Sequence, residues 1–176
     1  MARDRNELLE RLLQGYQRWY NIERTDAEPL AATAEYHEET AGYILSKKAR
    51  TWEAARHEYI WFYSVPHLTR ELAEQLLKQA VDGGNEKIHP RKGHMSSYIV
   101  AVFLTDQADE DAAALLKKCR IRKSFRFSLY GWMEVQTAMI VTGEETVTVN
   151  GAGRNTAKFI GNMLHPPVRH KLFKKE

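Results

Sequence analysis

Apolar residues recur every three or four positions near the start of the chain. They run from Leu8 to Tyr20, and charged and amide side chains fill the opposite side. This spacing predicts an amphipathic helix over about residues 4–20. The polar stretch over residues 21–29 is expected to be a connector.

The pattern then changes from helical spacing to strict alternation. Residues 32–40 alternate small or aromatic side chains with polar ones, which is typical of a strand with one buried face. Ala41-Gly42 is expected to turn the chain into a return strand over residues 43–48, which completes a hairpin. Residues 49–55 fit either a continuation of the sheet or a helical turn.

The next strand, Glu58–Val65, is apolar on both faces, so we expect it at the centre of a sheet. Pro66 is expected to end this strand because proline has no backbone N–H. Thr69 then caps a helix that Gly83-Gly84 closes. Residues 85–94 are expected to form a polar loop.

The second half of the chain predicts three more strands and two more helices. The strands cover residues 98–104, 125–141 and 146–150, and the helices run from Asp106 or Asp109 to Cys119 and from the Gly151–Asn155 turn to Leu164. Alternation in the second of these strands directs Phe125, Phe127 and Leu129 to the interior. Gly131 is expected to mark a bulge or bend in it.

These elements follow the order αβββαβαββα and predict an α/β (α+β) fold, with one central mixed sheet and helices packed on it. With 176 residues, 43% of them hydrophobic, the chain is long enough to bury a core. Residues 1–164 are expected to form a single domain, and residues 165–176 a basic tail.

Composition narrows the classes of protein further. No apolar run reaches the ~18 residues that a membrane span needs, and the first residues lack the apolar core of a signal peptide. Cys119 is the single cysteine, so an internal disulfide is excluded. We therefore expect a cytoplasmic protein without a membrane partner.

The net charge of +3 is unevenly distributed. Residues 117–126 contain six basic side chains and no acidic one, residues 158–176 are also basic, and the remaining chain is net acidic. Cations for phosphates and aromatic faces for bases are the ingredients of a nucleic-acid surface. The candidates are Lys117, Lys118, Arg120, Arg122, Lys123 and Arg126, with Tyr130 and Trp132 for stacking. The alternative interpretation of this segment is a solvated, charged connector.

Carboxylate and imidazole side chains suggest a second kind of site. Glu35, His37 and Glu39 share one face of the predicted strand over residues 32–40, and Glu58 lies on another strand. Such ligands, converging from neighbouring strands, would bind a divalent metal ion. The structural alternative is the solvated face of a hairpin, where alternating charged residues are expected.

Two resemblances bear on these alternatives. The first rests on four segments, which are Tyr43–Ala49, Trp52, Glu58-Tyr59 and Ser128–Met133. Through them the chain resembles an uncharacterised bacterial protein family over about residues 31–163. The opening order of elements is similar to that in the core of the PD-(D/E)XK nucleases, the restriction-endonuclease-like superfamily. That resemblance implies an acid on the second core strand and Glu-x-Lys on the third.

This chain departs from the nuclease pattern at both places. The corresponding third strand reads Glu58-Tyr59-Ile60, with isoleucine in place of lysine, and the strand predicted over residues 43–48 contains no acid. The resemblance therefore implies the topology without the catalytic motif, unless Lys47 or Lys48 replaces the lysine in space.

The sequence favours a non-catalytic binding module for an anionic partner, nucleic acid above all, that uses no cofactor. The first alternative is a metal-dependent phosphodiesterase that holds a divalent metal ion with the acidic and histidine residues named above. The second is a protein-interaction subunit, including a homo-oligomer, whose interface uses Trp52, Trp61 or the amino-terminal helix.

Overall fold

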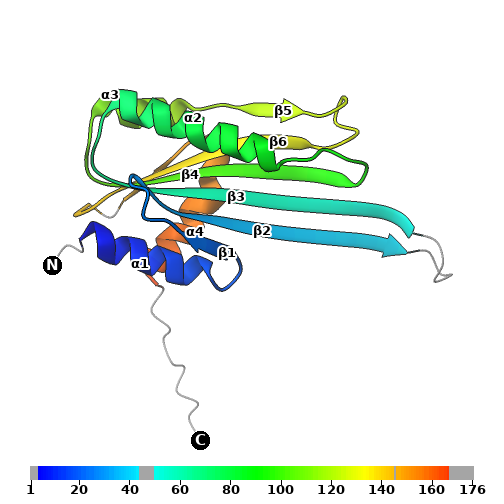
Figure 1. Ribbon diagram of the computed structural model, residues 1–176, viewed down its shortest axis with the longest axis horizontal. Helices are drawn as coiled ribbons and strands as arrows, with labels where there is room; N and C mark the ends of the chain where they lie inside the picture. The colour runs from blue at the N-terminus through cyan, green and yellow to red at the C-terminus, as the bar shows by residue number, and fades with distance from the viewer. Residues whose placement is uncertain (1–3, 44–49, 145, 167–176) are drawn as a thin grey trace, which may run out of the picture.

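The computed structural model describes residues 4–43, 50–144 and 146–166, and over these residues a seven-stranded mixed sheet lies between two pairs of helices (Figure 1). The predicted α/β class is confirmed. The elements are α1 (Arg5–Tyr16), β1 (Asn21–Arg24), β2 (Leu30–Tyr43), β3 (Arg50–Leu68), α2 (Arg70–Lys87), β4 (His94–Ala108), α3 (Glu110–Lys118), β5 (Arg122–Ser124), β6 (Trp132–Val141), β7 (Val147–Val149), the 3₁₀ helix η1 (Gly151–Gly153) and α4 (Arg154–Leu164).

The sheet joins an antiparallel meander to a parallel core. The strand order is β1-β2-β3-β4-β6-β5, and β7 also pairs with β6. β1, β2 and β3 are antiparallel, whereas β3, β4 and β6 are parallel and are connected through α2 and α3. Both crossovers proceed in the same direction across the sheet, so the right-handed rule places α2 and α3 on one face.

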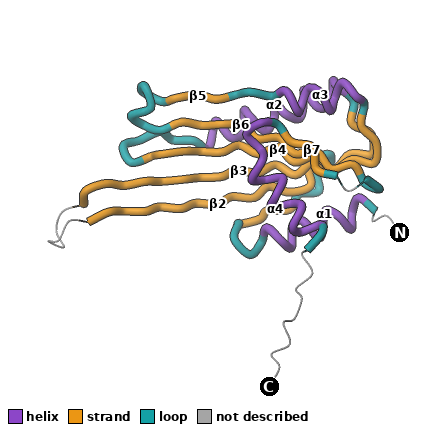
Figure 2. Tube along the Cα trace, turned by 180° about the vertical axis from the view of Figure 1, so that it is seen from behind, coloured by secondary structure: helices purple, strands orange, loops and turns teal. Residues whose placement is uncertain are grey.

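Each face of the sheet has its own hydrophobic core because side chains alternate along β3. Trp61 and Tyr63 pack with α2 and α3, whereas Ile60 and Phe62 pack with α1 and α4. Figure 2, the view from behind, shows α4 crossing its face of the sheet near α1. The predicted central position of this strand is therefore explained by burial on both sides.

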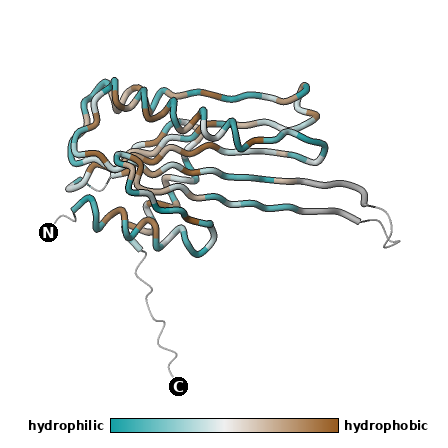
Figure 3. Tube along the Cα trace, viewed as in Figure 1, coloured by the Kyte–Doolittle hydropathy of each residue, from teal (hydrophilic) through white to brown (hydrophobic). Residues whose placement is uncertain are grey.

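The strands extend beyond the helices at one end of the molecule. β2 and β3 continue together as a two-stranded ribbon, and Figure 3 shows mostly hydrophilic positions on the coloured part of it that adjoins the sheet. On β3 the change occurs between Ile60, which is buried, and Arg56, which is exposed. Polar side chains of both faces are thus concentrated at this end of the sheet.

The antiparallel meander differs from the prediction at three places. Asn21–Arg24 is a strand and not part of a connector, because its backbone completes the edge of β2. β2 continues through Ala41-Gly42, so the predicted turn there is wrong. β3 passes through Pro66 instead of ending there, because the Pro66 nitrogen lies beyond the start of β2 and loses no ladder hydrogen bond. Residues 50–55 belong to β3, so the sheet continues there, as one of the two expected alternatives had it.

Helix α2 also differs from the prediction at its end. Thr69 caps its first turn as expected, with its side chain accepting from the N–H of Leu72 at 3.2 Å. However, Gly83 and Gly84 lie inside the helix instead of closing it. They let the helix approach the sheet, since a Cβ at Gly84 would lie 2.5 Å from two carbon atoms of Ile99. Among the described residues, the helices are too short or too polar to cross a membrane.

Replacing Gly84 by alanine tests this close approach. We expect Gly84→Ala to lower the free energy of unfolding by about 1–3 kcal/mol, because the added methyl group overpacks the contact with Ile99. Gly161→Ala is the matched control, since a Cβ at Gly161 in α4 has no neighbour within 4 Å. The control is expected to be neutral or stabilising by up to about 1 kcal/mol through helix propensity. Chemical denaturation of both variants measures the difference, and equal effects would contradict the packing argument.

Candidate functional site

The six basic residues singled out in the sequence follow one edge of the sheet. Lys117 and Lys118 end α3, Arg120 lies in the following link, Arg122 and Lys123 form most of β5, and Arg126 begins the turn to β6. All but Arg126 have a neighbouring residue of like charge within two positions. Within the described part of the chain, no carboxylate forms an ion pair with any of the six. Their charge is therefore not neutralised locally.

Three of these cations lie over aromatic rings instead. The Arg122 guanidinium is 4.3 Å from the centroid of Trp132. The Arg126 guanidinium is 4.9 Å from Tyr130, and the Lys123 ammonium is 5.7 Å from Phe125. Each contact is within the ~6 Å range of a cation–π interaction, worth about 0.5–1 kcal/mol at exposed sites. The rings hold the cations in place while leaving their outer sides in solvent.

The turn between β5 and β6 is not the strand that alternation predicted. Arg126, Phe127 and Ser128 have φ angles of 46°, 54° and 68°, in the left-handed region that non-glycine residues seldom adopt. This backbone turns Phe127 outward, so that it is 99% exposed, and leaves Leu129 75% exposed. The predicted interior positions of Phe127 and Leu129 are wrong, whereas Phe125 does pack against the core beneath α2 and α3.

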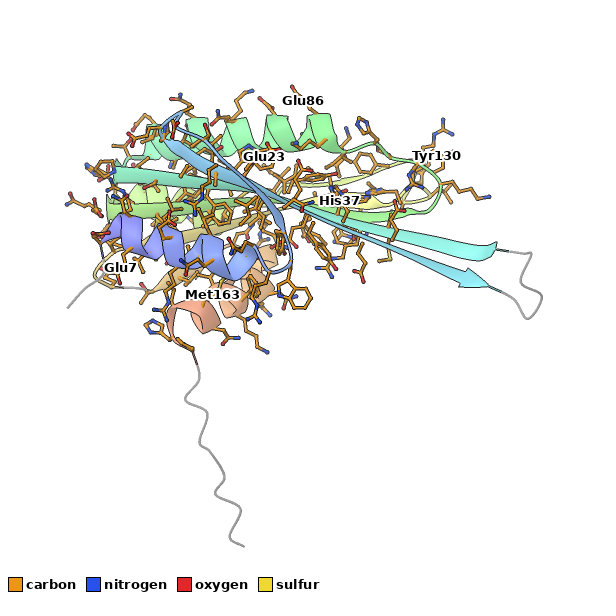
Figure 4. All side chains as sticks on the ribbon, turned by 60° about the horizontal axis from the view of Figure 1, so that its bottom comes forward. Glu7, Glu23, His37, Glu86, Tyr130 and Met163 are labelled. Carbon is orange, nitrogen blue, oxygen red and sulfur yellow. The ribbon has the colours of Figure 1, made fainter. Side chains whose placement is uncertain are left out.

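Gly131 ends this turn for a steric reason. Its φ is 78°, and a Cβ there would lie 2.5 Å from the carbonyl oxygen of Met95. Tyr130, immediately before it, is labelled in Figure 4 at the end of the molecule where the β2–β3 ribbon extends. The carbonyl of Tyr130 also lies 2.6 Å from Nδ1 of His94, which anchors the turn to β4.

A row of alternating cations and rings continues inward from this edge across the α1/α4 face. Tyr98 of β4 packs edge-on against Trp132, with centroids 5.3 Å apart at 86°. The Arg56 guanidinium of β3 lies 5.0 Å from the Tyr98 centroid. Arg122, Trp132, Tyr98 and Arg56 thus form what we call the cation–aromatic row, which spans β5, β6, β4 and β3.

The row ends at a polar cavity of about 330 Å³ between the sheet, α1 and the start of α4. Its lining residues are Tyr16, Tyr20, Arg56, Glu58, Tyr98, Glu134, Gln136, Ala152, Asn155, Thr156 and Phe159. Glu58, Tyr98 and Glu134 are aligned on adjacent strands β3, β4 and β6, so all three side chains project from the same face. Sequence reasoning missed this site because its residues come from elements far apart in the chain.

Glu58 is hydrogen-bonded inside this cavity. Its Oε2 accepts a hydrogen bond from the Tyr20 hydroxyl at 3.0 Å. Burial raises the pKa of Glu58, and the Tyr20 hydrogen bond and the Arg56 charge only partly oppose that effect. Burial and the nearby Glu58 charge raise the pKa of Tyr20 in turn. The pair is a hydrogen-bonded contact between the link that follows α1 and strand β3.

Glu35, His37 and Glu39 share the opposite face of the sheet. His37 Nδ1 lies 2.8 Å from His57 Nδ1, and His37 Nε2 lies 3.2 Å from Oε2 of Glu35. Burial and the neighbouring histidines lower the pKa of His57. Figure 4 labels His37 on the β2–β3 pair.

Two carboxylates of this face are held by cations from outside β2. Lys87 at the end of α2 pairs with Glu35, and Arg91 pairs with Glu39 at 2.8 Å. Burial acts to raise the pKa of Glu35, but the hydrogen bonds from Lys87 and His37 outweigh it and lower that pKa. These contacts give the acidic residues a structural role in attaching the α2–β4 loop to the sheet.

The residues proposed for a metal ion are thus divided between two faces. Glu35, His37 and Glu39 point toward the α2 side, whereas Glu58 points toward α1, because Glu35 pairs with Tyr59 and Tyr36 with Glu58. Across the described residues, no group of three or more histidine, cysteine or acidic side chains is arranged to hold a metal ion. The four candidates do not form one site.

At the positions of the PD-(D/E)XK nuclease motif, the structure places other side chains. Ile60, at the position where the nuclease motif has lysine, is fully buried in the core beneath α1 and α4. The strand facing Glu58 presents Tyr36 and not an acid. Lys47 and Lys48, the suggested substitutes, lie outside the described residues. Trp61, proposed for a protein interface, is buried under α2, and the side chain of Trp52 lies outside the described part.

Comparisons with known proteins identify a family but no function. A family model described as "Domain of unknown function (DUF8052)" matches residues 4–162. The chain therefore belongs to this family, which confirms the resemblance to an uncharacterised one. Neither the curated proteins nor the solved structures include a significant match.

The contact between Glu58 and Tyr20 predicts a specific dependence of stability on pH. Because burial raises the folded-state pKa of Glu58, its contribution to stability is complete below the unfolded-state pKa and is lost as pH rises through the folded-state pKa. Glu58→Gln keeps an acceptor for Tyr20 without a charge. We expect the variant to gain stability over the parent at about pH 8 relative to about pH 4.

Denaturant unfolding at both pH values measures this gain. Glu23→Gln on β1 is the control, because it removes one carboxylate at an exposed position away from the cavity. A pH profile of Glu58→Gln that parallels the profile of the parent would contradict the assignment.

Proposed function

We propose that the protein binds single-stranded nucleic acid along the β5 edge and the turn that follows it. The interacting residues are Lys117, Lys118, Arg120, Arg122, Lys123, Arg126, Tyr130 and Trp132, to which the exposed Phe127 is added. The observation that carries the proposal is the set of six basic side chains that lack carboxylate partners in the described structure, three of them held over aromatic rings.

The shape of the edge favours a flexible single strand over a rigid duplex. Arg122 pairs with Glu134 and Lys123 with Met133, so the two neighbouring cations project from opposite faces of the sheet. A nucleic-acid backbone must therefore bend around the edge for its phosphates to reach both cations. Single strands bend in this way, and their unpaired bases stack on aromatic side chains.

Phe127 supplies the most accessible ring for such stacking. It is almost completely exposed at the tip of the turn, with Arg126 beside it and Leu129 two residues further on. An exposed apolar side chain held by an unusual backbone costs free energy in the isolated protein. Base stacking on the ring, worth about 1–3 kcal/mol per base, would offset that cost.

Fluorescence anisotropy with labelled homopolymeric DNA and RNA oligonucleotides tests the proposal. We expect affinity to fall linearly with salt on logarithmic axes, and Arg122→Gln and Lys123→Gln each to reduce the slope by about 0.7 by removing a phosphate contact. Arg70→Gln is the matched control, since Arg70 is an exposed cation at the start of α2. Absence of binding at low salt, or an equal effect of the control, would overturn the proposal.

A second pair of variants separates stacking from charge. We expect Phe127→Ser to weaken binding by about 5- to 150-fold without changing the salt slope, because it removes a stacked base but no cation. Trp19→Ser is the control, since Trp19 is also exposed, at 69%, but follows α1. If Phe127→Ser binds as tightly as the parent, the ring is not a stacking platform.

A further inference from the structure

The polar cavity lies where the cation–aromatic row ends, and some of its polar groups have no protein partner. Gln136 is only 7% exposed, and its Oε1 accepts a hydrogen bond from the Thr156 hydroxyl at 2.6 Å. Within the described chain, no acceptor pairs with its amide nitrogen. Among the described residues, the buried side-chain atoms that lack a partner do not include this nitrogen, so the N–H₂ group is reached from the cavity and is available for a ligand.

Glu134 stands beside Gln136 on the same face of β6 and provides the complementary acceptor. It is half-buried, and among the described residues neither a hydrogen-bond donor nor a cation pairs with its carboxylate. Arg122 lies opposite Glu134 in the strand pairing, yet its guanidinium rests on Trp132. Glu134 and Gln136, two positions apart on β6, thus give the cavity a carboxylate acceptor and an amide donor.

The cavity walls and size indicate a flat ligand. Tyr98 of β4, Phe159 of α4 and Tyr20 of the link after α1 supply aromatic surface. A volume of about 330 Å³ is at the lower end of the ~300–1,000 Å³ typical of ligand pockets. The site therefore suits one small planar group rather than a long chain of them.

We infer that this cavity receives a single guanine base of the bound strand. Guanine presents N1–H and the N2 amino group side by side, which match the two oxygens of the Glu134 carboxylate, and its O6 accepts from the Gln136 amide. Thymine and uracil have no amino group, and cytosine and adenine present one amino donor beside a ring acceptor that would face the carboxylate. Unpaired bases are read through such edges and stacked between aromatic side chains.

The cation–aromatic row provides the path for the strand. Arg122 and Arg56 are available to phosphates at its two ends, and Trp132 and Tyr98 lie between them on the face that leads to the cavity. This inference rests on the proposed function, because it assigns base recognition to the strand that the β5 edge binds. A free guanine nucleotide carries the same base, so the experiment must distinguish binding of the free nucleotide from binding of a guanosine within a strand.

Anisotropy titrations compare oligouridylate with the same oligonucleotide carrying one central guanosine. We expect the guanosine to tighten binding by about 5- to 150-fold, the range of a bidentate base contact, and cytidine or adenosine at that place to do much less. Glu134→Gln should abolish the gain without weakening the binding of oligouridylate, because it removes no cation from the β5 edge. Glu23→Gln, which removes an exposed carboxylate from β1, should keep the gain.

The outcomes separate this inference from the proposed function. Salt-dependent binding of oligouridylate without any gain from guanosine would overturn base recognition and leave the edge as a binding surface. Calorimetry with guanosine monophosphate addresses the second source: binding of the free nucleotide that Glu134→Gln removes, with no gain in the oligonucleotide, would overturn the assignment to a strand. A gain that survives in Glu134→Gln would place the base elsewhere and overturn the role of the cavity.

Discussion

The arrangement of polar and apolar side chains depends on a mismatch in length between strands and helices. A helix rises about 1.5 Å per residue and a strand about 3.3 Å, so the 19 residues of β3 extend far beyond the 11 residues of α4. Each face of the sheet therefore has a covered part, represented by Ile60 and Trp61, and an uncovered part. Alternation continues through both parts, and where the helical cover ends Glu58 lines the polar cavity and Arg56 is exposed.

The sequence was most informative where a pattern was long and local. The helical spacing of α1, the Thr69 cap of α2 and the apolar run in β4 all follow from residues adjacent in the chain. β1 escaped prediction because its four residues are mostly exposed and are ordered only by pairing with β2. The alternation over residues 125–130 was misleading, since three consecutive positive φ angles there replace a strand with a turn.

The same distinction applies to the candidate site. The basic segment is contiguous in the sequence, so composition alone revealed it. The row that joins Arg56, Tyr98 and Trp132 exists only because parallel pairing brings three distant strands into register. The supposed convergence of Glu58 with Glu35 failed for a matching reason: the register of β2 and β3 aligns Glu58 with Tyr36, and one position along a strand exchanges the two faces.

β6 has two short partners along its outer side, β5 at its beginning and β7 at its end. The outer side of β5 is left as an open sheet edge, where unpaired backbone groups invite another chain to add a strand and polymerise. Arg122 and Lys123 occupy this edge, and two copies meeting there would bring like charges together. Whatever these cations bind, their repulsion therefore also opposes self-association of the molecule into fibres, so a substitution that neutralised the edge would raise the risk of aggregation.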